Sequence, residues 1–272
     1  MSQIKSEDRP LFREERLKTI LQLLLKEDKV YVTNLAELFD VSESSIRNDL
    51  AELQSRGLVR RTYGGAILPE ELSRKMVLDN SSIQSRTITY QKEKEAIGKA
   101  AAQLVSDGDT IMIDGGSTTL YVARYLSTKR DLKIITNAIN LATDLLAIPN
   151  VEIFFTGGVL DQRYSQLLGE ITVEILNRFH TSKAILGIDG ISVRGGLNAT
   201  DQQVAAIKRK IINRSDEVII VCDHSKIERI CLMPIAPISD VDYIITDSGA
   251  KPSHIEAIQN AGAKVILVDP ES

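Results

Sequence analysis

The stretch "VSESSIRNDLAELQSRGLVRRTYGGA", residues 41–66, combines a helical pattern with a glycine pair that follows it. Ser42 is a suitable N-cap, and Gly57 is the kind of residue at which helices commonly end. Between them an apolar stripe recurs at three- and four-residue spacing: Ile46, Leu50 and Leu53. Beyond Gly57, β-forming residues flank Gly64 and Gly65, which indicates a hairpin. The stretch therefore predicts a helix followed by a two-stranded wing.

Two further helices are predicted upstream of this stretch. Residues 13–25 carry an amphipathic pattern made by Leu17, Ile20, Leu21, Leu24 and Leu25. Thr33 is a plausible N-cap for a second helix over residues 34–39, which we expect to end near Asp40. The apolar residues expected to face the first helix are Leu35, Leu38 and Phe39. Three helices followed by a hairpin define a small winged helix-turn-helix domain, which we assign to residues 1–68.

Polar side chains on the outer face of the third helix suit a DNA groove. Arg47 and Asn48 are residue types that make paired hydrogen bonds to guanine and adenine edges, and the small Ser44 and Ser45 allow close approach. The wing can reach the sugar-phosphate backbone or the minor groove. The predicted DNA-contacting residues are Thr33, Ser42, Ser44, Ser45, Arg47, Asn48, Arg60, Arg61, Tyr63 and Gly64.

A helix of this kind, taken singly, is usually an ordinary solvated surface helix. The order of helix, turn, helix and hairpin favours the DNA-binding interpretation instead. Charge is a caution, because four arginines oppose three acidic residues across residues 42–66 and leave only one excess positive charge. One such domain is expected to bind DNA weakly, so two on one duplex would gain effective concentration. We therefore expect a homo-oligomer, a dimer or a tetramer.

Composition limits the rest of the 272-residue chain. Aromatic residues make up 4% and Trp is absent, which favours an Ile-, Leu-, Val- and Ala-rich core as in parallel sheets covered by helices. Two cysteines, Cys222 and Cys231, are too few for a disulfide framework or a zinc site. The net charge of -4 excludes a globally basic protein, and the polar start and lack of a spanning apolar run predict a cytoplasmic protein without membrane contact.

From about residue 92 onward, helical stretches alternate with short apolar segments. These predicted strands cover residues 110–114, 132–136, 151–155, 183–187, 217–221, 242–246 and 263–268. The alternation predicts an α/β domain with a mainly parallel sheet over residues 92–272. The polar, Ser-rich segment 69–91 is interpreted as a linker between the two domains.

Residues that could hold an anion follow the ends of the predicted strands. The segment "DGGSTT", residues 114–119, places hydroxyl residues at a helix start, where backbone N–H groups favour phosphate, although a plain tight turn fits about equally well. Carboxyl ends of parallel strands converge on one crevice, so polar residues after other strands are expected nearby. Lys208 and Lys226 are candidate cations, and solvated lysines fit each position equally well.

Over residues 42–66 the chain resembles the DeoR family of bacterial transcriptional regulators, whose signature is similar to "S-x-x-TIRRDL-x-x-L-x-x-x-G-x-x-x-R-x-HGGA". The matching residues are Ser42, Ser45, Ile46, Arg47, Asn48, Asp49, Leu50, Leu53, Gly57, Arg61, Tyr63, Gly64, Gly65 and Ala66. Ser45, Asn48 and Tyr63 depart from the usual Thr, Arg and His, which affects which operator is bound. The resemblance continues through the second domain.

The resemblance implies that the second domain is similar to ribose-5-phosphate isomerase and glucosamine-6-phosphate deaminase folds and senses a phosphorylated sugar. The implied effector-binding residues are Asp114, Gly115, Gly116, Ser117, Thr118, Thr119, Thr136, Asn137, Gly157, Gly158, Ser165, Gly169, Asp189, Lys208, Asp223 and Lys226. Val204 and Ala205 stand where many relatives carry Glu-Ala, which bears on the identity of the effector.

The expected function is therefore a repressor of a carbohydrate catabolism operon, which binds double-stranded operator DNA and is relieved by a phosphorylated sugar. One alternative is an active sugar-phosphate isomerase or deaminase with an appended DNA-binding domain. Another is a winged helix used only for protein contacts. The scattered His180, His224 and His254 do not assemble into an acid-base pair in the sequence. We expect no catalytic residue, no metal ligand and no cofactor.

Overall fold

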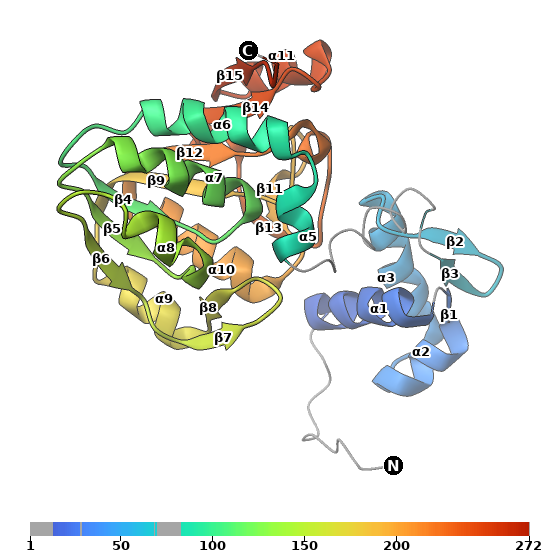
Figure 1. Ribbon diagram of the computed structural model, residues 1–272. Helices are drawn as coiled ribbons and strands as arrows, with labels where there is room; N and C mark the ends of the chain where they lie inside the picture. The colour runs from blue at the N-terminus through green and yellow to red at the C-terminus, as the bar shows by residue number, and fades with distance from the viewer. Residues whose placement is uncertain (1–12, 28, 68, 70–82, 272) are drawn as a thin grey trace. The chain divides into compact units, whose positions relative to one another are not determined.

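The structure is a computed structural model that describes residues 13–27, 29–67, 69 and 83–271. The chain falls into two compact units, residues 1–78 and residues 79–272, here called the head unit and the sensor unit (Figure 1).

The described part of the head unit forms a three-helix core with a small antiparallel sheet. Its elements are α1 (Arg13–Glu27), β1 (Lys29–Tyr31), α2 (Val32–Phe39), α3 (Glu43–Ser55), β2 (Arg60–Thr62) and β3 (Gly65–Ile67). The hydroxyl of Ser42 accepts the backbone N–H of Ser45 at 3.2 Å, which confirms the predicted N-cap of α3. The predicted inward stripe of α3 is confirmed, since Ile46, Leu50 and Leu53 are fully buried.

Two details of α2 differ from the prediction. The helix begins at Val32 with Tyr31 as its N-cap, so the prediction of Thr33 as N-cap was wrong. The cause is strand β1, which leads directly into the helix and pairs with β3, while the Val32 N–H donates to the Gly64 carbonyl at 2.9 Å. Leu38, predicted to face inward, is 60% exposed, because the buried stripe runs through Val32, Leu35 and Phe39.

Glycine is required at the two positions of the wing for different physical reasons. Gly64 has φ of 75°, a left-handed conformation that favours glycine in the turn between β2 and β3. At Gly65 a Cβ atom would lie 2.0 Å from the Val30 carbonyl oxygen, because β3 lies between β1 and β2 in the order β1-β3-β2. A third strand that precedes α2 therefore completes the wing.

The sensor unit contains, among its described residues, a seven-stranded sheet in the spatial order β15-β14-β12-β9-β4-β5-β6, with all neighbours parallel. Its strands are β4 (Thr110–Ile113), β5 (Lys133–Thr136), β6 (Glu152–Phe155), β9 (Thr181–Gly187), β12 (Ser215–Val221), β14 (Tyr243–Asp247) and β15 (Lys264–Val268). All the strands predicted from the sequence are confirmed. The chain enters at β4, runs outward to β6 and returns to β9 on the other side of β4. The strand order thus reverses between β4 and β9, where α/β sheets place their ligand crevice.

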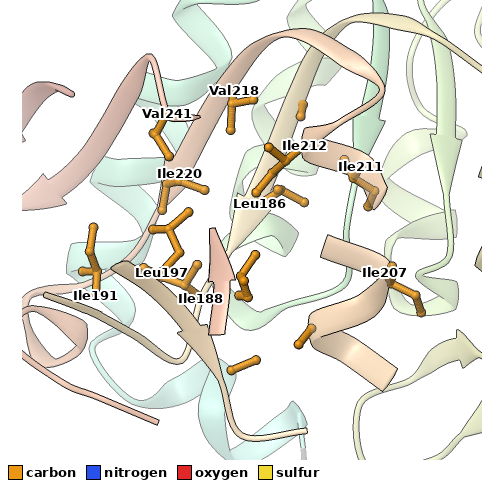
Figure 2. Close-up of a cluster of buried hydrophobic side chains, with 14 of the residues drawn as sticks. Leu186, Ile188, Ile191, Leu197, Ile207, Ile211, Ile212, Val218, Ile220 and Val241 are labelled. Atoms are coloured by element: carbon orange, nitrogen blue, oxygen red, sulfur yellow. The ribbon is translucent and has the colours of Figure 1, made fainter. Parts of the chain in front are cut away.

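Both faces of this sheet are covered, which explains the continuous apolar runs of its strands. The covering helices are α6 (Gln91–Gln103), α7 (Ser117–Tyr125), α8 (Ala142–Leu145), α9 (Glu170–Asn177), α10 (Gln202–Ile212) and α11 (Pro252–Asn260) (Figure 1). Ile185 of β9 packs in the cluster with residues of α6 and α7, and Leu186 packs with Ile207 and Ile211 of α10. Figure 2 shows the second cluster, to which Ile220 of β12 also belongs.

Several short elements were not predicted. They are α5 (Ile83–Ile88), β7 (Val159–Asp161), β8 (Gln166–Leu168), β10 (Gly190–Ser192), β11 (Gly196–Ala199), β13 (Met233–Ala236) and the 3-10 turns Leu126–Thr128, Ile139–Leu141, His224–Lys226 and Ile238–Asp240. Strands β7 and β8 form a hairpin, and β10, β11 and β13 form an antiparallel sheet. Residues 83–91 lie in the segment predicted as a linker but belong to the sensor unit, because Ile83 is buried there. Residues 70–82 of that segment lie outside the described residues.

Candidate functional site

The outer face of α3 carries the predicted base-contacting side chains. Ser44, Arg47 and Asn48 are exposed and Ser45 is half-buried. Arg47 pairs with Glu43 at 2.6 Å, one turn earlier on the same helix. The hydroxyls of Ser42 and Ser45 lie 3.0 Å apart and hold the helix start. Arg47 and Asn48 are thus the side chains of this face best placed to reach a base edge.

Two of the three acidic residues that weakened the charge argument lie away from this face. Asp49 is 1% exposed and accepts Arg16 at 2.6 Å and Arg13 at 3.3 Å, both from α1. Glu52 pairs with Arg56 at 2.7 Å, and this arginine lowers the pKa of its carboxyl. Because α1 neutralises Asp49, the outer face of α3 is more positive than the count along the segment indicates.

The wing presents the remaining predicted DNA-contacting residues to solvent. Tyr63 is fully exposed at the turn, beside the exposed Gly64. Arg60 and Arg61 are both exposed on β2. Thr33 is exposed in the first turn of α2, where its hydroxyl donates to Asn34 Oδ1 at 3.2 Å. The structure therefore leaves these side chains accessible to a second macromolecule.

The segment predicted to hold a phosphate joins β4 to α7, and its glycine turn has extended backbone at Gly116, the N-cap of α7. The hydroxyl of Thr119 is committed to this turn, because it donates to the Gly116 carbonyl at 3.2 Å and the residue is fully buried. Ser117 is half-buried and Thr118 is 7% exposed, and their hydroxyls have no hydrogen-bond partner within the described residues. Ser117 and Thr118, with the first N–H groups of α7, therefore keep hydrogen-bonding groups that an anion could use.

Directly below this turn lies a buried ion pair. Lys208 of α10 donates to the carboxylate of Asp114 and, at 2.8 Å, to the Gly187 carbonyl. The Gly187 N–H in turn donates to Asp114 Oδ1 at 3.0 Å. Burial raises the pKa of Asp114, and the attraction of Lys208 opposes that effect. The pair joins the ends of β4 and β9 where the strand order reverses.

Further carboxylates follow the neighbouring strands. Asp189 accepts the backbone N–H of Thr200 at 2.9 Å and its hydroxyl at 3.0 Å. Burial acts to raise the pKa of Asp189, but Lys226 and the Thr200 N–H outweigh burial and lower it. Asp223 accepts the backbone N–H of Ser225 at 3.1 Å. The prediction that strand ends bring polar groups to one edge agrees with this arrangement.

Sequence reasoning missed two groups at this edge. Asp247, at the end of β14, accepts His224 Nδ1 and the His224 backbone N–H, each at 2.7 Å. Lys94 of α6 is 3% exposed, donates to the Arg86 carbonyl at 2.6 Å and lies 3.9 Å from Asp223. Burial lowers the pKa of Lys94 to about 8. Its spacing from the buried Ile97 and Ala101 of the same helix is the sequence signal that could have found it.

The hairpin β7–β8 covers part of the cradle with Gln166, another residue that the sequence did not reveal. Gln166 is 3% exposed, donates to the Gly115 carbonyl and accepts Asn137 Nδ2 at 3.2 Å. A Cβ atom on Gly115 would lie 2.4 Å from the Gln166 side chain. Gly115 and Asn137 therefore serve the docking of this hairpin.

Other implied effector residues also make contacts within the fold. The Thr136 hydroxyl donates to the Ile113 carbonyl at 2.7 Å and accepts the Ala138 N–H at 3.0 Å. At Gly158, φ is 121° and a Cβ would lie 2.3 Å from Thr172 Oγ1. Positive φ angles are found at three further positions of the set: Gly157, Ser165 and Gly169. These contacts and angles are local requirements of the fold.

The described residues contain no cluster of three or more His, Cys, Asp or Glu side chains that could hold a metal ion. No helix in that part of the chain is long and apolar enough to cross a membrane. His180 pairs with Asp216 at 2.6 Å on the surface, away from the strand ends described above.

One unit carries an exposed helix and wing, and the other carries buried charged side chains at the point where the order of a parallel sheet reverses; this combination is typical of a DNA-binding regulator with a sensor domain. The family model of the DeoR-like helix-turn-helix domain matches residues 16–71, and the model of the DeoR C terminal sensor domain matches residues 89–248. The chain belongs to the DeoR family of transcriptional regulators, as the sequence resemblance implied.

The similarity to known repressors extends over most of this chain and most of theirs. The HTH-type transcriptional repressor GlcR of Bacillus subtilis (strain 168) is 31% identical, over 96% of this chain and 98% of its own. The glycerol-3-phosphate regulon repressor of Escherichia coli (strain K12) is 35% identical, over 86% of this chain and 90% of its own. A ribose 5-phosphate isomerase from Plasmodium falciparum shares 19% identity over 49% of this chain and 51% of its own, with a TM-score of 0.35. A similarity of that extent carries no conclusion about activity.

Proposed function

We propose that the protein represses transcription of a carbohydrate catabolism operon, binds operator DNA through α3 and the wing, and is released by a phosphorylated sugar in the sensor unit. The observation that carries this proposal is the outer face of α3, where Arg47 and Asn48 are exposed while Asp49 is buried against α1. The names of its relatives support it, since they are repressors and one governs a glycerol-3-phosphate regulon.

The energetics of Arg47 favour an exchange of partners on DNA. Its pair with Glu43 is an exposed contact one helical turn apart, a kind worth about 0.3–0.5 kcal/mol. A bidentate contact to a guanine edge is worth about 1–3 kcal/mol of discrimination. Arg47 can therefore leave Glu43 for a base at a net gain, and the free N–H groups at the start of α3 can hold a phosphate.

The sensor unit offers the chemistry that a sugar phosphate needs. The Ser117 and Thr118 hydroxyls and the N–H groups at the start of α7 suit the phosphate. Asp189 and Asp223 lie at neighbouring strand ends and are of the type that accepts sugar hydroxyls. The effector class therefore combines one phosphate group with several hydroxyls.

We infer that the functional form is a homo-oligomer, a dimer or a tetramer. A single head unit that makes few phosphate contacts falls in the non-specific range of roughly 10⁻⁴–10⁻⁶ M. Two heads on one duplex raise the affinity through effective concentration, and closed two-fold symmetry is the commonest arrangement of such chains.

A second candidate function, an active sugar-phosphate isomerase or deaminase, gains one observation. Asp247 Oδ2 lies 2.7 Å from His224 Nδ1, and a carboxylate in that position can orient an imidazole as a general base. A coupled assay on pentose and hexose phosphates with the wild type and His224→Ala tests it. Turnover that is lost in the variant would establish the enzyme, and absence of turnover on the whole panel would remove it.

The repressor is tested with DNA selected from a random-sequence pool by the full-length protein. Binding is measured by fluorescence anisotropy against a scrambled duplex, for the wild type, Arg47→Ala and Asn48→Ala. Each variant should lose about 1–3 kcal/mol of discrimination. Arg178→Ala, which removes the exposed arginine at the C-cap of α9, is the matched control. Unchanged discrimination in both head variants would contradict the assignment of α3 as the reading helix.

A further inference from the structure

The helix α5 is the first described element after residues 70–82, which connect it along the chain to the head unit. Polar contacts hold it to the sensor unit. The Ile83 N–H donates to the Arg163 carbonyl at 3.1 Å, and the Tyr121 hydroxyl donates to the Thr87 carbonyl at 3.4 Å. Tyr121 belongs to α7, whose first turn is the phosphate cradle. Helix α5 thus lies beside the helix that begins at the candidate site.

Further contacts tie α5 to carboxylates of that site. Lys94 donates to the backbone carbonyls of Arg86 and Thr89, and its ammonium lies 3.9 Å from Asp223. The Arg86 guanidinium lies 4.0 Å from Asp189. Both carboxylates belong to the predicted effector-binding set, so α5 and its capping lysine depend on groups that a ligand would also use.

Arg86 is poorly satisfied where it stands. Its side chain is 17% exposed and lies over the ring of Tyr164, with 5.3 Å between Cζ and the ring centroid. Its Nε is buried and has no hydrogen-bond partner in the described part of the chain. The gap of 4.0 Å to Asp189 is too long for a hydrogen bond. A guanidinium offers five N–H donors in a planar fork that matches a phosphate, so Arg86 has donors left for an anionic ligand.

The charges around Asp189 also favour an anion. Its pKa is lowered by several cations, which act against burial: Lys226, Lys208 and Arg86. The repulsion of Lys226 and Arg86 lowers the pKa of Lys94, and the attraction of Asp223 raises it. Lys94, Lys208, Lys226 and Arg86 thus lie among the carboxylates Asp114, Asp189 and Asp223. A negative group of a ligand placed next to Arg86 would be attracted by these cations.

We propose that Arg86 binds the phosphate of the effector and thereby couples occupancy of the site to the position of α5 and of the chain that leads to the head. This inference rests on the proposed function. Arg86 lies 4.0 Å from Asp189, without a hydrogen bond to it. A phosphate in the cradle gives the guanidinium a bidentate partner, and Asp189 is released to accept sugar hydroxyls. Arg86 lies on α5, so the exchange displaces the helix backbone that Lys94 holds.

The test uses the full-length wild type, Arg86→Met, Arg86→Lys and the exposed control Arg178→Met. The probes are ribose 5-phosphate, fructose 6-phosphate, glucose 6-phosphate and glycerol 3-phosphate, each with its unphosphorylated counterpart, together with inorganic phosphate. The compound that raises the melting temperature of the wild type most is then used. Its dissociation constant is measured by calorimetry, and operator affinity is measured by anisotropy without probe and with saturating probe.

In Arg86→Met the probe should bind roughly 10- to 150-fold more weakly, as expected for loss of a hydrogen bond between charged groups. In the wild type the ratio of operator affinity without probe to that with saturating probe should be roughly 5- to 150-fold, as for a typical allosteric coupling. In Arg86→Met this ratio should lie close to one. Arg86→Lys should retain part of the probe affinity, because it keeps the charge but not the planar fork. Arg178→Met should match the wild type.

A second measurement does not depend on the folding of any variant. Addition of the probe to the wild type should change the hydrogen exchange of backbone amides in residues 83–91. Unchanged exchange there, or wild-type probe affinity and operator response in Arg86→Met, would overturn the inference and leave the proposed function standing. If no phosphorylated compound alters operator binding by the wild type, the proposed function fails and the inference fails with it.

Discussion

Removal of Lys208 should destabilise the sensor unit strongly, because it strands a buried carboxylate. Asp114 is 1% exposed and Lys208 is 6% exposed at the side chain. In Lys208→Met the carboxylate keeps one hydrogen bond, from the Gly187 N–H at 3.0 Å, and the Gly187 carbonyl loses the lysine donor. Breaking a buried pair from one side costs about 3–5 kcal/mol.

The pH dependence of this loss follows from the pKa of Asp114. Burial already raises that pKa, and removal of Lys208 removes the attraction that opposes it. When the pKa of an acidic group is higher in the folded than in the unfolded state, the free energy of unfolding falls as the pH rises from the unfolded pKa through the folded pKa. The destabilisation in Lys208→Met should therefore be smaller at pH 5 than at pH 7, since protonation at low pH removes the buried charge.

A double-mutant cycle isolates the pair. Asp114→Asn and Lys208→Met should each cost several kcal/mol, whereas the double variant buries two neutral side chains and should lie within about 2 kcal/mol of the wild type. Urea unfolding is followed by circular dichroism, because the chain has no Trp. Leu50→Ala removes a buried side chain of the head unit, so the transition that it shifts is that of the head unit. Single variants within about 1 kcal/mol of the wild type, or costs that simply add, would refute the reasoning.

Three further outcomes are expected. Arg60→Ala should weaken binding to all DNA sequences alike and reduce the salt slope by about one, and an unchanged slope in anisotropy titrations would contradict phosphate contact. Thr118→Val should weaken effector binding roughly 10-fold or more in calorimetry, whereas Thr119→Val should cost about 1 kcal/mol of stability, because of these two hydroxyls that of Thr119 donates to the Gly116 carbonyl. The reverse pattern would refute the cradle. The folded pKa of Lys94, about 8, lies below the ordinary 10.5, so the wild type should gain up to about 3 kcal/mol of stability between pH 8 and 10.5. Lys94→Met should lack that gain in pH-dependent urea unfolding, and equal curves would show that Lys94 titrates normally.

The sequence predicted the features whose signals are local. The cap at Ser42 and the stop at Gly57 lie next to the helix they bound, so α3 was predicted within a residue at each end. The strands of the large sheet are buried on both faces, which makes each a continuous apolar run. The short strands β10, β11 and β13 carry no such run, since β11 reads Gly-Leu-Asn-Ala and pairs with a strand more than thirty residues away.

The features that the sequence missed depend on contacts between distant residues. Asp49 counted against DNA binding until α1 supplied Arg16 from 33 residues upstream. Asp114 and Lys208 were each predicted as effector-binding residues, but their pairing across 94 residues could not be predicted from the sequence. Lys94 was not singled out from the sequence, and its charged neighbour Asp223 is distant along the chain. Charge along a segment therefore predicts a surface poorly where other elements supply counter-charges.

The strengths of these attachments decide which part of the sensor unit can respond to a ligand. An effector that changes operator affinity has a coupling energy of about 1–3 kcal/mol to distribute. The Asp114–Lys208 pair needs about 3–5 kcal/mol to break from one side, so the floor of the site at β4 and β9 stays fixed. The hydrogen bonds of the Ile83 N–H and of the Thr87 carbonyl are worth about 0.5–1.5 kcal/mol each, and those from the Lys94 ammonium about 1.5–3 kcal/mol each. The Arg86–Asp189 contact has no hydrogen bond, so an effector within that range can replace this contact while the floor stays in place. Arg86 lies on α5, the first described helix after the segment that follows the head unit in the sequence.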